Sequence, residues 1–455
     1  MADLYTAAKV DFNNVIGKLK HQLHGSNNCP ALYSRSLTQF DDEFKKMNFW
    51  GTRTHDWALW NQGQRMVDTH FVFPLEHLDP KNPENYYFRA TDAIIKLAHG
   101  CNMRVFYRLG TSIEHSSRAK NADEHYNTHV PKDPAHYAEI LAGIVRHYTR
   151  GWADGFEYKD MEYWEIWNEP ELGQMWAGTD EEFVTLFVTV LKRLKSEFPE
   201  LKVGGPAFAW VDENFLVKIL DRCKEENVAP DFVSWHSYSS DVEALAYQPV
   251  RVREILDKHG FTKTETCLNE WHYLISWDGV QSSASYDMRM RAVNGPCGLH
   301  GIDSACFNLA ILTAWHDTPL DTAYYYGANL DSVWGFREDN RKENKNSFSM
   351  KMMGRMLYEA EDRVQTENYQ HKKTIYTLGA LAKDGNGGRL IVTDYRGASE
   401  TIEIDVEGME GTQVTATVMD AVHDSYPANV IWNGKKLTIV KNTTGSSAFY
   451  VTFKK

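Results

Sequence analysis

The chain has 455 residues, which is more than one hydrophobic core usually holds, so we expect one large domain and a smaller companion. Its 42% hydrophobic and 24% charged residues are typical of a globular protein in water. The formal net charge of −13 argues against nucleic acid or an anionic membrane as a partner.

The six cysteines are scattered, with no CxxC pair and no metal-ligand spacing, so we expect neither a metal nor another cofactor. The first residues lack the basic and apolar regions of a signal peptide, and no apolar run is as long as a membrane span. These features predict a cytoplasmic protein. A secreted protein whose signal peptide has been removed is the alternative, and a homo-oligomer is compatible with this composition.

Aromatic and β-branched runs that end in polar residues recur along the first three quarters of the chain and predict buried strands. Amphipathic helices are expected between them, with N-terminal signals at Asn82-Pro83, Asp133-Pro134 and Thr179. The expected strands are residues 23–28, 48–56, 103–110, 163–167, 202–206, 231–238, 264–270 and 303–310. Eight strands alternating with helices predict a (β/α)₈ TIM barrel of the α/β class. A doubly wound nucleotide-binding fold would require a glycine fingerprint after the first strand, and the sequence has none.

From about residue 373 the pattern changes to short strands of alternating hydrophobicity without helices between them. The expected strands are residues 375–380, 389–394, 401–406, 414–419, 436–440 and 448–453. They predict a small C-terminal antiparallel β-sandwich domain.

Two of the expected barrel strands end in an asparagine followed by a glutamate. Asn168-Glu169-Pro170 ends the aromatic run from Tyr163 to Trp167, and Asn269-Glu270 ends a second run 101 residues later. The carboxyl ends of barrel strands are where catalytic residues lie. Two glutamates in this position are the minimum set for retaining glycoside hydrolysis.

The resemblance to a family rests on motifs that lie in order at the expected strand ends: His24-Gly25-Ser26-Asn27-Asn28, Arg53-Thr54-His55, Trp167-Asn168-Glu169-Pro170, Ser234-Trp235-His236-Ser237-Tyr238 and Asn269-Glu270. With them the sequence resembles glycoside hydrolase family 39 of clan A, the family of β-xylosidases and α-L-iduronidases. The resemblance implies a retaining mechanism with Glu169 as acid/base and Glu270 as nucleophile. It also implies that the N-terminal segment joins the sandwich, so that residues 15–355 form the barrel and residues 1–14 with 356–455 form the accessory domain. His316-Asp317-Thr318-Pro319 and Tyr324-Tyr325-Tyr326 depart from the family pattern, which leaves the substrate open.

The proposed chemistry needs one protonated and one ionised carboxyl. We expect a raised pKa for Glu169 and a depressed pKa for Glu270, with Arg53 as the cation beside Glu270. A structural pairing of Arg53 with another acid in the barrel is nearly as good an interpretation. Asn168 is expected to bind the 2-hydroxyl of the sugar, and Glu165 is expected to face into the barrel in a buried ion pair.

Further sugar contacts are expected from His55 and His236, whose neutral imidazoles can bind hydroxyl groups at strand tips. Tyr238 could orient the nucleophile through its hydroxyl or simply pack in the core. Trp315, just beyond the last expected strand, could form the platform under the sugar ring. Glu171 follows the proline and is expected to be solvated.

The leading prediction is an exo-acting retaining glycosidase, most simply a β-xylosidase, which acts on an oligosaccharide or small glycoside without a metal. Its pocket would be closed by the long segments 111–132 and 271–290. A relative that cleaves a β-glucoside, an arabinoside or an α-L-iduronide is the alternative within the enzyme class. An inactive carbohydrate-binding protein is the alternative outside it, but its signature would be the loss of one of the two glutamates, and both are present.

Overall fold

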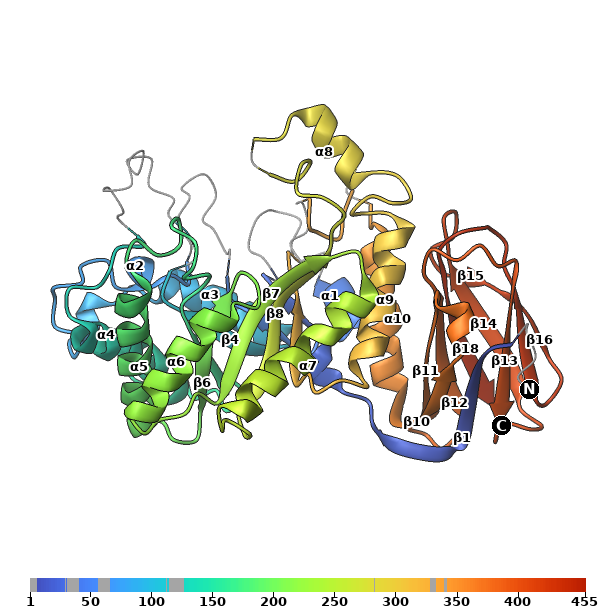
Figure 1. Ribbon diagram of the computed structural model, residues 1–455, viewed down its shortest axis with the longest axis horizontal. Helices are drawn as coiled ribbons and strands as arrows, with labels where there is room; N and C mark the ends of the chain where they lie inside the picture. The colour runs from blue at the N-terminus through green and yellow to red at the C-terminus, as the bar shows by residue number, and fades with distance from the viewer. Residues whose placement is uncertain are drawn as a thin grey trace.

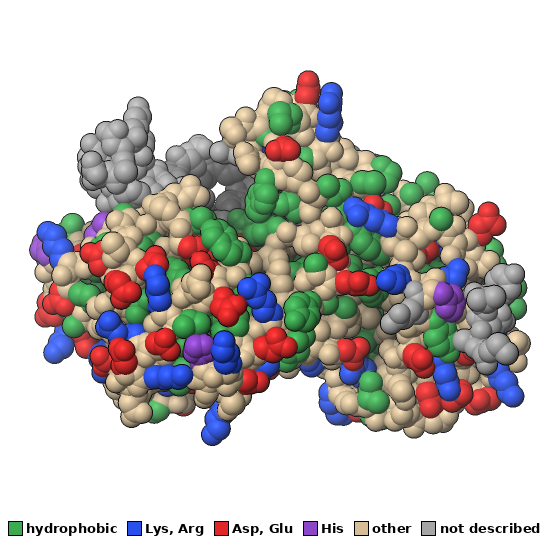
Figure 2. All heavy atoms as spheres, viewed as in Figure 1, with side chains coloured by type: hydrophobic (Ala, Val, Ile, Leu, Met, Phe, Trp, Pro, Cys, Tyr) green, Lys and Arg blue, Asp and Glu red, His purple; other side chains and the backbone are tan. Residues whose placement is uncertain are grey.

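The computed structural model describes residues 6–28, 30, 41–55, 66–111, 113, 127–281, 283–327, 333–338 and 342–455. A closed barrel with surrounding helices forms one part of the molecule, and a large rolled β-sheet forms the other (Figure 1). On the face shown in Figure 2, acidic and basic side chains are intermixed over the helices of the barrel. Within the described ranges, no helix is long and apolar enough to cross a membrane.

The barrel consists of eight parallel strands in chain order. They are β2 (Gly25–Asn27), β3 (Gly51–Arg53), β4 (Arg104–Leu109), β5 (Tyr163–Ile166), β6 (Lys202–Phe208), β7 (Phe232–Ser239), β8 (Glu265–Tyr273) and β9 (Thr322–Tyr325). The helices of this part are α1 (Asp41–Met47), α2 (Thr69–Val72), α3 (Arg89–Gly100), α4 (Pro134–Thr149), α5 (Asp180–Glu197), α6 (Glu213–Glu225), α7 (Val242–Lys258), α8 (Tyr286–Val293), α9 (Ile302–Trp315) and α10 (Lys345–Glu359). The predicted (β/α)₈ barrel is confirmed.

Two of the three predicted helix starts are confirmed. The side chain of Asp133 accepts hydrogen bonds from the first turn of α4, and Thr179 forms a capping box with Glu182 at the start of α5. Asn82 and Pro83 instead open a single 3₁₀ turn (Pro83–Asn85), and α3 begins only at Arg89.

The prediction of a strand over residues 303–310 is wrong, because these residues lie in α9, and the eighth barrel strand is β9. Every residue of α9 except Ala314 is buried. A helix that is apolar on all sides has no periodic pattern to separate it from a buried strand. The helix is buried on nearly all sides because it lies between the barrel and the accessory sheet, where it contacts both (Figure 1).

The barrel interior is filled by layers of side chains. Aromatic and apolar groups from five strands form one cluster: Phe106, Tyr163, Phe232, Cys267 and Tyr324. Two positions further along β5, β7 and β8, on the same face of each strand, stand Glu165, Ser234 and Asn269. These buried polar side chains hydrogen-bond to one another and form the floor of the mouth of the barrel.

The accessory domain is one ten-stranded sheet in the order β15-β14-β18-β12-β11-β10-β1-β13-β17-β16. It rolls up until β14 and β16 are in contact and encloses its own apolar core, which confirms the predicted sandwich-like domain. Its strands are β1 (Thr6–Lys18), β10 (Ala360–Asn368), β11 (Ile375–Ala382), β12 (Gly388–Asp394), β13 (Thr401–Glu407), β14 (Gln413–Met419), β15 (Tyr426–Pro427), β16 (Asn429–Trp432), β17 (Lys436–Val440) and β18 (Ser447–Lys454).

The N-terminal strand β1 lies inside this sheet, antiparallel to β10 and parallel to β13. From Thr6 onwards the chain therefore runs from the accessory domain through the barrel and back. The exact domain boundaries, at residues 15 and 355, stay predictions.

Candidate active site

The turn after β5 places Glu169 at the mouth of the barrel. Trp167 and Glu169 both have left-handed backbones, with φ of 74° and 46°. This conformation costs energy for residues with a side chain and persists only where the surroundings impose it. Here the backbone N–H of Trp167 donates to Leu109 O and that of Glu169 donates to Ala207 O, each at 2.9 Å. The neighbouring strands β4 and β6 thus hold the turn that presents the Glu169 carboxyl.

A bulge in β8 gives Asn269 and Glu270 different tasks. Along the β7–β8 ladder, Trp235 pairs with Leu268 and His236 pairs with Glu270, so Asn269 is an extra residue. The side-chain Nδ2 of Asn269 donates to Glu165 Oε1 at 2.5 Å in the buried polar layer, while the Glu270 side chain reaches the mouth of the barrel. Bulges of this kind turn a side chain to a new direction and are common next to active sites.

Arg53, at the end of β3, connects the polar layer to the mouth. Its Nε donates to Glu165 Oε2 at 2.7 Å, and its Nη1 donates to Glu270 Oε1 at 2.9 Å. The remaining donors reach Asn168 Oδ1 at 2.9 Å and Asn27 Oδ1 at 3.2 Å. The guanidinium and Glu165 are fully buried. Both interpretations of Arg53 therefore apply at once: it is the cation beside Glu270 and the partner of a structural acid, and Glu165 forms the predicted buried ion pair.

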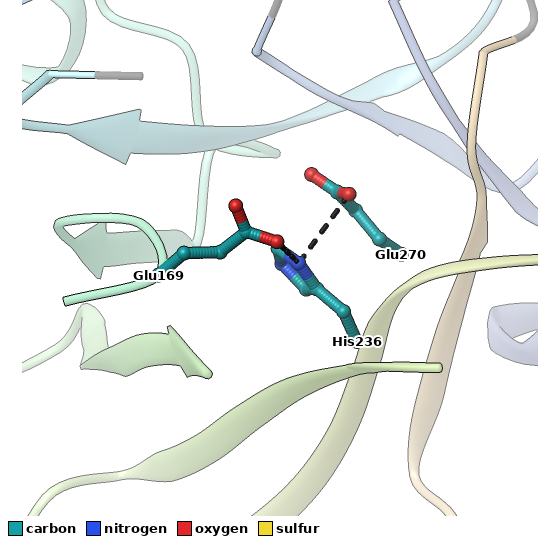
Figure 3. A group of neighbouring side chains, drawn as sticks. All are labelled: Glu169, His236 and Glu270. Atoms are coloured by element: carbon teal, nitrogen blue, oxygen red, sulfur yellow. Dashed lines mark hydrogen bonds and ion pairs between the residues drawn. The ribbon is translucent and has the colours of Figure 1, made fainter. Parts of the chain in front are cut away.

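The side chains of Glu169 and Glu270 face each other across His236 (Figure 3). His236 Nδ1 lies 2.8 Å from Glu169 Oε1 and 3.4 Å from Glu270 Oε2. One oxygen of each carboxyl and the imidazole nitrogen all lie within 4.8 Å of one another. Tyr238 donates to Glu270 Oε2 at 2.7 Å, and His55 Nε2 lies 3.2 Å from Glu270 Oε1.

The expectation of a depressed pKa for Glu270 is wrong. Burial raises its pKa above the ordinary value, while His236, Arg53 and the Tyr238 hydroxyl oppose that rise. Burial also lowers the pKa of His236 to about 4, so this imidazole is neutral at neutral pH. The Glu169 side chain is 15% exposed and that of Glu270 is 4% exposed, so Glu169 has the better access to solvent.

Glu169, His236 and Glu270 are also the one group in the described part of the chain whose spacing would suit a metal ion. Arg53 already places a positive charge 2.9 Å from Glu270 Oε1, which works against a second cation there. Activity without a metal stays a prediction.

Trp315 is not the sugar platform. It lies at the end of α9 with 0% exposure, and its indole packs edge-on against Trp271 at 5.0 Å. The prediction failed because it depended on the eighth strand being at residues 303–310. The residue that follows the true eighth strand is Tyr326, and its ring lies 5.8 Å from that of Tyr238.

Two tryptophans from loops complete an aromatic wall beside the Glu270 carboxyl. The ring of Tyr238 lies 5.0 Å from Trp277 and 5.5 Å from Trp334. Trp277 is 48% exposed, so the wall extends to the surface. Trp334 reaches it because Gly327, with φ of 75°, has no Cβ: an added Cβ would lie 2.2 Å from that of Trp334. Neither tryptophan carries a local sequence signal, since each approaches the site only through the folding of its loop.

Glu171 is half-buried, contrary to the expectation that it is solvated. Its Oε1 accepts from Ala209 N at 2.7 Å, and burial, aided by the charge of Glu169, raises its pKa to about 8. Of the segment predicted to close the pocket over residues 111–132, residues 112 and 114–126 lie outside the described residues, so pocket closure stays a prediction.

A sequence model of the family described as "Glycosyl hydrolases family 39" matches residues 18–260. A beta-xylosidase from Geobacillus stearothermophilus is 28% identical over 158 residues, which are 34% of this chain and 31% of the relative. A beta-xylosidase from Caldicellulosiruptor saccharolyticus is 29% identical over 164 residues, which are 35% of this chain and 32% of the relative. The chain thus aligns with about a third of the length of these curated relatives.

Two solved structures share the complete fold. A glucosidase from Croceicoccus marinus superposes with a TM-score of 0.77 at 22% identity and covers 99% of both chains. A monomeric beta-xylosidase from Caulobacter crescentus superposes with a TM-score of 0.71 at 14% identity and covers 98% of this chain and 99% of its own. The family match covers more than half of the chain, including Glu169 and His236, and on this evidence the chain belongs to glycosyl hydrolase family 39.

Proposed function

We propose that this protein is an exo-acting, retaining glycoside hydrolase that cleaves β-xylosides, with Glu169 as acid/base and Glu270 as nucleophile. The observation that carries the proposal is the placement of the two carboxyls at opposite sides of His236, all within 4.8 Å. Retaining enzymes hold their carboxyls about 5–5.5 Å apart, whereas inverting enzymes need about 6.5–9.5 Å to admit a water molecule. The xyloside is favoured because both curated relatives carry the name beta-xylosidase.

In the first step, the carboxylic acid of Glu169 gives its proton to the glycosidic oxygen. A carboxylate oxygen of Glu270 bonds to the anomeric carbon as the bond from that carbon to the leaving oxygen breaks. In the second step, the Glu169 carboxylate takes a proton from water. The water oxygen then bonds to the anomeric carbon, and the ester bond to Glu270 breaks and restores its carboxylate. Each step inverts the anomeric carbon, so the product retains the configuration of the substrate.

The contacts of each carboxyl favour this division of roles. Arg53 and Tyr238 each donate to a different oxygen of Glu270, which holds the carboxylate in one orientation and stabilises it as a leaving group in the second step. Glu169 is the more exposed of the two and can exchange protons with solvent between steps. Arg53 orients the carboxamide of Asn168, which supports the proposal that Asn168 binds the 2-hydroxyl of the sugar.

His236 is neutral and serves as a hydrogen-bonding link between the two acids. Its Nε2 has no hydrogen-bond partner within the described part of the chain, so we assign the proton to Nδ1, which donates to Glu169 Oε1. This donation stabilises the Glu169 carboxylate that forms when the proton leaves. The aromatic wall of Tyr238, Trp277 and Trp334 supplies apolar faces for the C–H faces of a sugar ring.

A panel of nitrophenyl glycosides tests the substrate. We expect the β-xyloside to be cleaved with the highest kcat/KM, and the first product seen by NMR to be β-xylose. Faster cleavage of a β-glucoside, an arabinoside or an α-L-iduronide would show that the preferred glycone is that sugar and not xylose. An α-configured first product would exclude the retaining mechanism, and rapid cleavage within long polysaccharides would exclude exo action.

A further inference from the structure

Two consecutive residues of the accessory domain, Tyr395 and Arg396, which follow β12, contact the barrel at the ends of β7 and β8. The Tyr395 hydroxyl donates to the backbone oxygen of Ser240 at 2.7 Å. Nη2 of Arg396 donates to the hydroxyl of Tyr273 at 2.9 Å, and the guanidinium lies 5.8 Å from the centre of the Tyr273 ring. We refer to Tyr395 and Arg396 together as the accessory corner.

The two barrel residues held by this corner mark the ends of neighbouring strands. Tyr273 is the last residue of β8, and Ser240 directly follows β7. Ser239 pairs with Tyr273 in the β7–β8 ladder, and Leu274 N donates to Ser239 O at 3.1 Å. The accessory corner therefore holds both strands at the point where they leave the sheet.

These are the strands that carry the chemistry. Glu270 stands three positions before Tyr273 on β8, and Tyr238 stands two positions before Ser240 on β7. The hydroxyl of Tyr238 donates to Glu270 across the same pair of strands. A shift of one strand end relative to the other would change this hydrogen bond and the direction of the nucleophile.

The corner is itself fixed by contacts with Ser446 and Asp303. Arg396 has a left-handed backbone with φ of 58°, and its N–H donates to Ser446 Oγ at 2.9 Å. Ser446 Oγ donates to Asp303 Oδ1 at 2.5 Å, and Nε of Arg396 donates to Asp303 Oδ2 at 3.2 Å. Asp303 lies in the first turn of α9 and is 7% exposed. The Tyr273 hydroxyl also donates to Cys297 O at 3.0 Å, which ties down the end of the segment that carries Trp277.

We infer that the accessory domain positions the nucleophile, with Arg396 and Tyr395 as positioning residues that act through the ends of β8 and β7. This inference rests on the proposed function, because it assigns a geometric role in the attack by Glu270. Arg396 touches no reacting atom. Its side chain is 40% exposed, so its ion pair with Asp303 contributes little to folding, and its removal should leave the fold intact.

The test compares two contacts between the same domains. Arg396→Ala removes the contact with β8, whereas Asp424→Ala removes the ion pair of Asp424 Oδ1 with Lys345 Nζ, 2.6 Å long, at the start of α10. The readout is the rate at which a dinitrophenyl β-xyloside, with fluorine in place of the 2-hydroxyl, labels Glu270. This rate reports nucleophilic attack alone. Misplacing a reacting group by 1 Å can cost about a hundredfold, so we expect partial displacement to slow labelling by roughly tenfold in Arg396→Ala.

Asp424→Ala should label at the rate of the unaltered protein, with a melting temperature similar to that of Arg396→Ala. Tyr395→Phe, which removes one hydroxyl only, should slow labelling in the same direction. Tyr273→Phe removes the same contact together with the hydrogen bond to Cys297 O, so it should slow labelling at least as much as Arg396→Ala. The double variant should label no more slowly than Tyr273→Phe alone, because the contact between Arg396 and Tyr273 is then already lost.

Unchanged labelling in both Arg396→Ala and Tyr395→Phe would refute the inference while leaving the proposed function standing. Equal slowing in Asp424→Ala would also refute it, since domain docking in general would then be the cause. If the unaltered protein is not labelled at Glu270, the proposed function fails, and this inference fails with it.

Discussion

Arg53 is the residue whose replacement should reveal most about the site, because two buried carboxylates depend on it. It lies within 2.6 Å of Glu165 and 2.9 Å of Glu270, and all three side chains are at most 4% exposed. Arg53→Met keeps most of the volume and removes the charge. Removing one partner of a buried ion pair costs about 3–5 kcal/mol, and one kcal/mol corresponds to about 1 °C in a chain of this size, so we expect the melting temperature to fall by roughly 3–5 °C.

The cause of this loss can be separated from lost packing. If uncompensated negative charge is responsible, Arg53→Met combined with Glu165→Gln should be more stable than Arg53→Met alone. Burial already raises the pKa of Glu270, and removing the guanidinium raises it further. The folded variant then binds more protons than the unfolded chain, so its stability should increase as the pH falls from neutrality towards the ordinary pKa of a glutamate.

Differential scanning calorimetry at neutral pH and near pH 5.5 measures both effects. The charge argument would be refuted by two results together: Arg53→Met/Glu165→Gln is less stable than Arg53→Met, and the stability that Arg53→Met loses relative to the unaltered protein is as large at pH 5.5 as at neutral pH. Enzyme activity should be lost in either case, because the orientation of the nucleophile depends on Arg53.

Three further predictions concern the surroundings of the two glutamates. Tyr238→Phe removes a donor from the proposed nucleophile and so raises the pKa of that carboxyl, which should move the acid limb of the kcat/KM profile to higher pH; an unmoved limb would contradict this. Burial raises the pKa of Glu171 to about 8, so the folded protein favours the protonated carboxyl. This contribution to stability is complete below about pH 4.5 and is lost as the pH rises to 8, so the melting temperature of the unaltered protein should fall more steeply across this window than that of Glu171→Gln. Gly327→Ala should displace Trp334 and lower kcat/KM by about two- to tenfold. The control is Gly385→Ala, which introduces a similar backbone strain at φ of 72° but whose new Cβ has no atom within 4 Å, so it should keep full activity. Equal losses of activity in the two variants would contradict the role of Trp334.

The parts of the site that local sequence could predict are those that lie at strand ends. An aromatic run that ends at Asn168-Glu169-Pro170 predicts both a buried strand and the polar side chains at the end of that strand. Glu165 could be assigned to the interior because it lies within the predicted strand, four positions before Glu169. Arg53 could be named as a cation, but its four partners lie on β2, on β5, in the turn after β5 and on β8, and no local pattern contains these contacts.

The failures have a shared physical origin in contacts between distant segments. The α9 helix lost its amphipathic pattern because a second domain covers its outer side, and the misplaced strand then led to Trp315. The pKa of Glu270 depends on how deeply the folded barrel buries it, and that depth outweighs the nearby Arg53. The aromatic wall depends on how two loops return to the mouth of the barrel, one of them through Gly327.

The central claim is the division of labour between Glu169 and Glu270, and rescue by azide of their alanine variants tests it most directly. With a dinitrophenyl β-xyloside, Glu169→Ala should still form the glycosyl-enzyme, because the leaving group needs no proton. Added azide should then speed turnover and give the β-configured glycosyl azide, since an anion needs no general base. Glu270→Ala should be inactive without azide. A β-azide from Glu270→Ala together with an α-azide from Glu169→Ala would show that the roles are exchanged, and substantial activity in both variants without azide would place the chemistry elsewhere.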